Sequence, residues 1–178
     1  VNGVRAALFV VSPSQINFAV PPGISLGAAT IIVANQAGSY AAGTVEIAAT
    51  APALFTLNST GTGDAWASAT VDGINYQLPP FDVTVAGRPN ILVLNGTGIR
   101  RAPATNPNDN DGVAESVTAT IGGRAARVLY AGAQGDFTGL DQLNIEIPAG
   151  LAGGGPRRVE VIITVNGVAA NRVMIQLK

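Results

Sequence analysis

Two heptapeptides decide the fold: QINFAVP at residues 15–21 and QLNIEIP at residues 142–148. Both read Gln, apolar, Asn, apolar, any residue, apolar and Pro, so apolar side chains fall on every second position. This spacing is typical of a β-strand with one buried face, and Pro, which lacks an amide donor, marks the end of such a strand. We expect a strand at each place, and we expect the two strands to be copies of each other.

The similarity continues in the same order on both sides of the heptapeptides. The matching segments are residues 1–9 and 121–129, residues 29–33 and 159–163, and residues 44–47 and 172–175. Four strand candidates that recur in one order indicate an internal duplication. Between the copies, Asp72-Gly73 separates two alternating segments, which predicts a β-hairpin over residues 66–78.

The sequence therefore predicts an all-β protein of two immunoglobulin-like β-sandwich modules related by internal duplication. We expect the first module at residues 1–57, a linker and hairpin at residues 58–86, and the second module at residues 87–178. Strand candidates at residues 90–94 and 116–121 precede the second copy, and the first copy has none before Val1. A sandwich of this kind needs about seven strands. The first module is therefore expected to be incomplete, with an open strand edge.

Two sources for the missing strands stay open. The chain begins without an initiator Met or a signal peptide, so they could lie in a longer precursor upstream of Val1. Alternatively, another subunit supplies a strand by β-strand addition, which would make this protein the subunit of a polymer.

The repeated amides and prolines form a candidate structural motif. Its members are Gln15, Asn17, Pro21, Gln142, Asn144 and Pro148. We expect the amides to point inward and to hydrogen-bond backbone groups at a strand end. A ligand-binding role for the four amides is the alternative.

The composition excludes several classes of function. Charged residues make up 12% of the chain and the net charge is -1, so no field steers nucleic acid or an anionic membrane. No apolar run is long enough to span a membrane. The absence of His and Cys removes Ser-His-Asp and Cys-His catalysis and Cys-type zinc sites. Because the carboxylates are dispersed, we expect no enzyme.

One polar loop is a candidate calcium site. Asn108, Asp109, Asn110 and Asp111 supply the oxygen atoms that Ca²⁺ prefers, although their spacing does not fit an EF-hand. A solvated turn is the alternative, because Asn, Asp and Gly favour turns for local reasons. No other cofactor is expected. Tyr40, Trp66, Tyr76 and Tyr130 form either a sugar-stacking platform or ordinary strand packing; we favour packing.

An ordered series of motifs resembles a known family. The series runs VNGVRAALFVVSPSQINFAVP, APALFTL, the Asp72-Gly73 hairpin, NILVLNGTGIR, ESVTATIGGRAARVLYAG and LDQLNIEIP. It resembles the uncharacterised C-terminal domain of secreted proteins from Solibacter and other Acidobacteria, over nearly the whole chain. The resemblance implies export, a place at the end of longer surface proteins and an immunoglobulin-like fold, and it implies no catalytic residues. Residues 101–112 are longer and more polar than that pattern. Asn58-Ser59-Thr60 and Asn95-Gly96-Thr97 match the N-glycosylation pattern, which has little force in a bacterial protein.

The function that follows is an extracellular or cell-surface structural or adhesive one. The chain would be a stalk or a self-assembling filament subunit joined by β-strand addition, with other copies of itself or adjacent domains as partners. The alternative is a polysaccharide- or surface-binding module at the end of a larger secreted protein.

Overall fold

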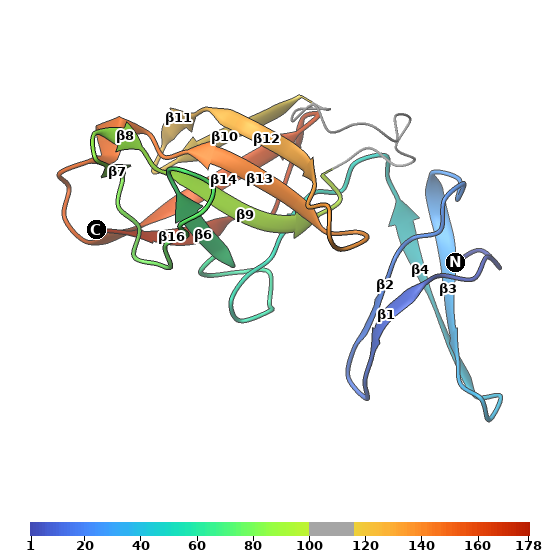
Figure 1. The fold of residues 1–178 in the computed structure, drawn as a ribbon. Helices are drawn as coiled ribbons and strands as arrows, with labels where there is room; N and C mark the ends of the chain where they lie inside the picture. Colours follow the sequence, from blue (N-terminus) through green and yellow to red (C-terminus); the bar gives the residue numbers. More distant parts are fainter. Residues whose placement is uncertain (100–115) are drawn as a thin grey trace. The chain divides into compact units, whose positions relative to one another are not determined.

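The computed structural model describes residues 1–99 and 116–178, and the described chain is all-β. Its one helical segment there is a short 3-10 turn at Ala149–Leu151. The chain divides into two compact units, unit 1 at Val1–Ala49 and unit 2 at Thr50–Lys178 (Figure 1). The division falls earlier than the expected boundary after residue 57.

Unit 2 is a sandwich of two five-stranded sheets. The first sheet has the order β11 (Arg124–Ala126), β10 (Val117–Ile121), β14 (Arg157–Val165) and β15 (Val168–Ala169), and β16 (Val173–Leu177) also pairs with β14. The second has the order β12 (Val128–Ala133), β13 (Asp141–Glu146), β9 (Ile91–Thr97) and β5 (Ala53–Leu54), and β6 (Ala67–Thr70) also pairs with β9. A small ribbon joins β7 (Thr84–Val85) to β8 (Arg88–Pro89). Because β5 and β6 pair with β9, residues that we expected at a module end and in a linker belong to unit 2.

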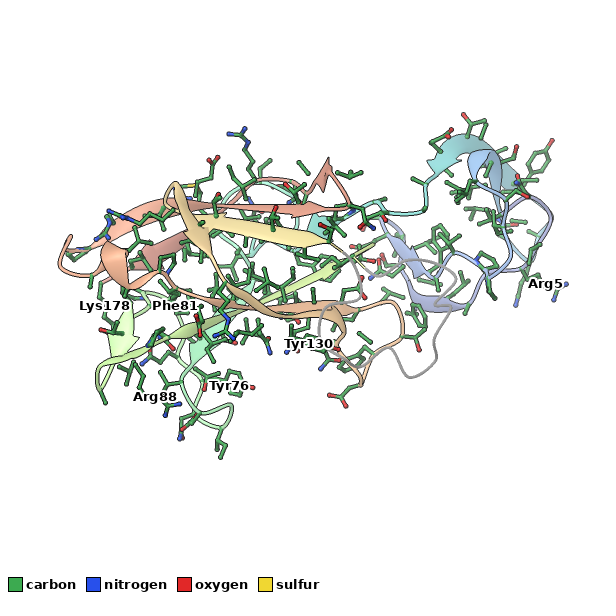
Figure 2. The ribbon with its side chains drawn as sticks, turned by 90° about the horizontal axis from the view of Figure 1, so that it is seen from above. Arg5, Tyr76, Phe81, Arg88, Tyr130 and Lys178 are labelled. Atoms are coloured by element: carbon green, nitrogen blue, oxygen red, sulfur yellow. The ribbon has the colours of Figure 1, made fainter. Side chains whose placement is uncertain are left out.

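The core of unit 2 lies between its two sheets. Leu143 and Ile145 of β13 and Val161 and Ile163 of β14 are fully buried and alternate with half-buried residues along each strand. Each such side chain contributes about 1.5–3 kcal/mol through its burial. Phe81, which is labelled in Figure 2, belongs to the same core cluster and is 1% exposed.

Unit 1 consists of two separate two-stranded ladders. One pairs β1 (Leu8–Val11) with β2 (Ile16–Phe18), and the other pairs β3 (Gly27–Ala34) with β4 (Tyr40–Ile47) (Figure 1). Pro21 and Ala29 are the only buried residues of this unit. Unit 1 therefore has strands but no hydrophobic core of its own.

The predicted hairpin at Asp72-Gly73 is present in a reduced form. Ala69 and Gln77 exchange both of their backbone hydrogen bonds, at 3.0 and 2.7 Å. Residues 74–78 otherwise form no strand, because the Asp72 carboxylate accepts hydrogen bonds from the amides of Ile74 and Asn75 and holds the chain in a turn.

Candidate strand-acceptor site

The first turn of unit 1 has the same geometry as the matching turn of unit 2. Asn2 and Gly3 have φ of 47° and 79°, and Gly122 and Gly123 have φ of 56° and 74°. Two successive positive φ values are typical of a type I′ hairpin turn. The Asn2 amide donates to the Thr30 carbonyl at 2.8 Å, and the Gly122 amide donates to the Glu160 carbonyl at 2.8 Å.

The ladders that follow these turns also agree. In both copies the register shifts across one residue of the first strand, at Phe9 and at Leu129. The flanking pairs are Leu8–Phe18 and Val10–Asn17 in unit 1, and Val128–Ile145 and Tyr130–Asn144 in unit 2. The matched turn, hydrogen bond and bulge support the internal duplication, which stays a prediction.

The repeated amides bond each other. Gln15 Nε2 donates to Asn17 Oδ1 at 2.6 Å, and Gln142 Nε2 donates to Asn144 Oδ1 at 2.8 Å. Gln142 and Asn144 lie on the outer face of their sheet, because the alternate positions of β13 are buried. The expected inward amides bonded to backbone groups are therefore not what this strand shows. Of the two prolines, Pro21 is buried and Pro148 stands at the start of the 3-10 turn.

Strand β3 of unit 1 matches strand β14 of unit 2 by sequence, and the two units differ along one edge of these strands. In unit 2, β10 pairs along β14 from Ile121–Val161 to Val117–Val165. In unit 1, β4 is the only strand that pairs with β3 within the described residues. We call the other side of β3, at residues 31–34, the open edge.

The hydrogen bonds of Thr30 show which backbone groups of β3 point to the open edge. The Thr30 carbonyl accepts from the Asn2 amide, and the Thr30 amide donates to Asn2 Oδ1 at 2.8 Å. Both backbone groups of Thr30 therefore point away from β4. Because this direction alternates along an antiparallel strand, the backbone groups of Ile32 and Ala34 point to the open edge as well.

Apolar side chains of unit 1 are exposed at positions where unit 2 buries them. Val33 is 44% exposed and its match Ile163 is 0% exposed. Val20 is 50% exposed and its match Ile147 is 0% exposed. Residues 27–34 contain no charge and no Pro, the features by which natural edge strands avoid pairing with another chain. Unit 1 thus presents a bare strand edge beside an uncovered apolar face.

Of the four aromatic residues that were candidates for a sugar platform, Trp66 has an aromatic partner that the sequence did not indicate. Trp66 is 51% exposed and stacks on Phe55, with ring centroids 6.2 Å apart. Tyr76 lies on the loop after β6, and Tyr130 lies on β12, where its hydroxyl donates to the Ala133 carbonyl (Figure 2). Tyr40 belongs to unit 1. The sequence did not single out Phe55, because Trp66 is brought beside it by backbone pairing across the intervening loop, where the Trp66 amide donates to the Phe55 carbonyl at 2.9 Å.

One carboxylate has a shifted pKa. Hydrogen bonds from the backbone amides of Asn75 and Ile74, and from the side chains of Asn75 and Thr70, hold the pKa of Asp72 well below its ordinary range. These bonds stabilise the hairpin turn. They indicate a structural role for Asp72.

The predicted calcium ligands Asn108, Asp109, Asn110 and Asp111 lie outside the described residues. Residues 1–99 and 116–178 hold no group of three or more His, Cys, Asp or Glu side chains placed for a metal ion. The same part of the chain has no helix that is both long and apolar enough to cross a membrane.

Comparison with known proteins adds no relative. No protein-family model, no curated protein and no solved structure matches this chain. The resemblance to the Solibacter-type secreted domain therefore rests on the motifs alone and stays a prediction.

Proposed function

We propose that this chain is a non-enzymatic structural or adhesive protein of the cell exterior whose unit 1 accepts β-strands from outside residues 1–49. One observation carries the proposal: Val20 and Val33 are half exposed, and the residues that match them in unit 2 are fully buried. In this function unit 1 connects the chain to its partner by accepting a strand, and unit 2 is a domain whose apolar core is already buried.

Physical considerations favour completion of unit 1 by an added strand. Isolated two-stranded ladders are marginally stable in water, and three or more strands with a packed apolar face are needed for independent stability. Each apolar side chain of Val or Ile size that an added strand covers contributes up to about 1.5–3 kcal/mol. Burial of several such side chains would drive association of unit 1 with a strand.

The amino-acid composition agrees with a role that involves no catalysis. The chain has no His and no Cys, so the common nucleophile and base pairs cannot form. A chain in which only 12% of the residues are charged suits a protein that covers much of itself in an assembly.

Electron microscopy of the purified chain tests the assembly role. We expect filaments or defined oligomers from the natural sequence and dispersed particles from Val33→Lys, which places a charge on the apolar face. Ala37→Lys is the charge-matched control, because Ala37 is exposed in the turn after β3 and lies outside the open edge. Dispersed monomers of the natural chain that bind no apolar dye would contradict the proposal.

A second candidate function has one specific observation behind it. The exposed Phe55–Trp66 pair lies beside β9, since the Phe55 amide donates to the Asn95 carbonyl. Asn95 is paired with Gln142, so aromatic rings and amides share the outer face of one sheet. Such a surface suits a polysaccharide, which stacks on rings and hydrogen-bonds to amides.

Trp66 is the only tryptophan, so its fluorescence reports on this face directly. Titration with soluble polysaccharides should shift its emission if a glycan binds there. Phe55→Ala should weaken the shift, and Phe137→Ala, which alters an exposed ring elsewhere, should leave it unchanged. No emission change with any polysaccharide would exclude this second function.

A further inference from the structure

The open edge of β3 is self-complementary. Ile32 and Ala34 carry the backbone groups that face it, and they lie symmetrically on either side of Val33. In an antiparallel pair formed by two copies of β3, with Val33 on a two-fold axis, Ile32 of one copy lies opposite Ala34 of the other. Each of these pairs can exchange both of its backbone hydrogen bonds.

Side-chain directions fit the same register. Val33 would face Val33 of the other copy as a pair without mutual hydrogen bonds, in which side chains approach most closely. Ile31 and Val33 lie on the face of β3 that matches the buried residues Val161 and Ile163 of β14. Pairing would therefore join the two uncovered apolar faces into one.

The ends of the paired segment are defined by contacts already present. Asn2 occupies the backbone groups of Thr30, and the turn after β3 begins where the Asn35 amide donates to the Ser39 carbonyl. Between these limits lie residues 31–34, with no charge to oppose pairing. The segment is thus short, apolar and bounded on both sides.

We propose that the strand accepted by unit 1 is β3 of a second copy of this chain, which gives a symmetric dimer with Val33 on its axis. Pairing with a second copy satisfies the unpaired backbone groups of two open edges at once. A single unrelated strand would instead leave its own far edge unpaired. This inference rests on the proposed function, because it names the strand that unit 1 accepts.

Disulfide trapping tests the register, since the natural chain has no Cys. Val33→Cys should form a disulfide-linked dimer on mild oxidation of dilute protein, because a pair of this kind places Cα atoms about 4.5 Å apart, within disulfide range. Ile32→Cys should crosslink far less, because its side chain lies off the axis. Val45→Cys controls for random collision, since Val45 is similarly exposed on β4. Equal crosslinking of all three variants, or none from Val33→Cys, would overturn the dimer.

A chimera separates failure of the dimer from failure of strand acceptance. Val1 matches Ile121, so a copy of residues 116–120 fused directly before Val1 would lie along β3 as β10 lies along β14. The chimera should be monomeric by light scattering, with slowed amide exchange at Ile32 and Ala34, and the natural chain should be a dimer. A monomeric natural chain with a stabilised chimera would overturn the second copy and keep strand acceptance. A chimera that shows no slowing at these amides would overturn both.

Discussion

Units 1 and 2 contain matching strands, but the side chains of these strands are buried in unit 2 and largely exposed in unit 1. Both have the type I′ turn, the amide hydrogen bond after it, the one-residue bulge and the paired Gln and Asn side chains. Yet Leu143 of unit 2 is 0% exposed, and unit 1 buries only Pro21 and Ala29. Local hydrogen bonding thus follows the local sequence, whereas burial depends on how many strands are present.

Two strands account for the difference. In unit 2, β9 pairs with β13, and β10 pairs with β14. They bring in Leu92, Leu94 and Ile121, each at most 1% exposed. The ladders of unit 1 have no strands in the corresponding places within the described chain.

Core truncation should show the largest contrast between the two units. Leu143→Ala removes a fully buried side chain, and we expect it to lower the free energy of unfolding of unit 2 by about 2–5 kcal/mol. Ile16→Ala, the sequence-matched change in unit 1, should cost less than about 1 kcal/mol in the monomer, because Ile16 is only half buried. Chemical denaturation followed by Trp66 fluorescence measures the first, and circular dichroism follows both. Equal losses would contradict the contrast.

A smaller difference in stability between the two units is expected for substitutions at Asn171 and at its matched position. Its side chain accepts from the Leu54 amide at 2.6 Å and donates to the carbonyls of Leu54 and Gly61 at 3.0 and 2.7 Å. Asn171→Ala should therefore lower the free energy of unfolding by about 1–3 kcal/mol, since it leaves partly buried backbone groups unpaired. The matched position in unit 1 is Gly43, which has no neighbour within 4 Å of an added Cβ. Gly43→Asn should leave thermal unfolding of unit 2 unchanged, and an unchanged melting temperature for Asn171→Ala would contradict the role of these bonds.

The smallest effect should come from the hairpin carboxylate. Because hydrogen bonds lower the pKa of Asp72 in the folded state, its contribution to stability is complete above the unfolded-state pKa, near 4. It is lost as the pH falls through the lowered folded-state pKa. The stability difference between the natural chain and Asp72→Ala should therefore shrink below about pH 4. A difference that grows on acidification would contradict the assigned bonds.

The alternating pattern predicted much of the fold from the sequence. Strands at residues 159–165 and 142–147 lie within a residue or two of β14 and β13. The all-β class is confirmed, while the immunoglobulin-like topology and the internal duplication stay predictions. The division at Ala49 was missed because β5 and β6 join unit 2 through β9, a contact that no local pattern indicates.

The candidate site was predictable in outline. An incomplete first module followed from the missing partners of its four strands, and the structure adds which backbone groups are free at Ile32 and Ala34. The outward direction of Gln142 and Asn144 could also have been read from the alternation, since Leu143 and Ile145 take the inward positions. The stacking of Phe55 on Trp66 could not, because it depends on a pairing across the loop between them.

Amide hydrogen exchange at Ile32 and Ala34, measured over a range of protein concentrations, tests the central claim most directly. If unit 1 takes its missing strand from a second copy, exchange at both amides will slow as the concentration rises. Exchange at the matched residues Ile162 and Thr164, which β10 already covers, will be slow at every concentration. Fast exchange at Ile32 and Ala34 throughout the range would contradict acceptance of a strand from a second copy.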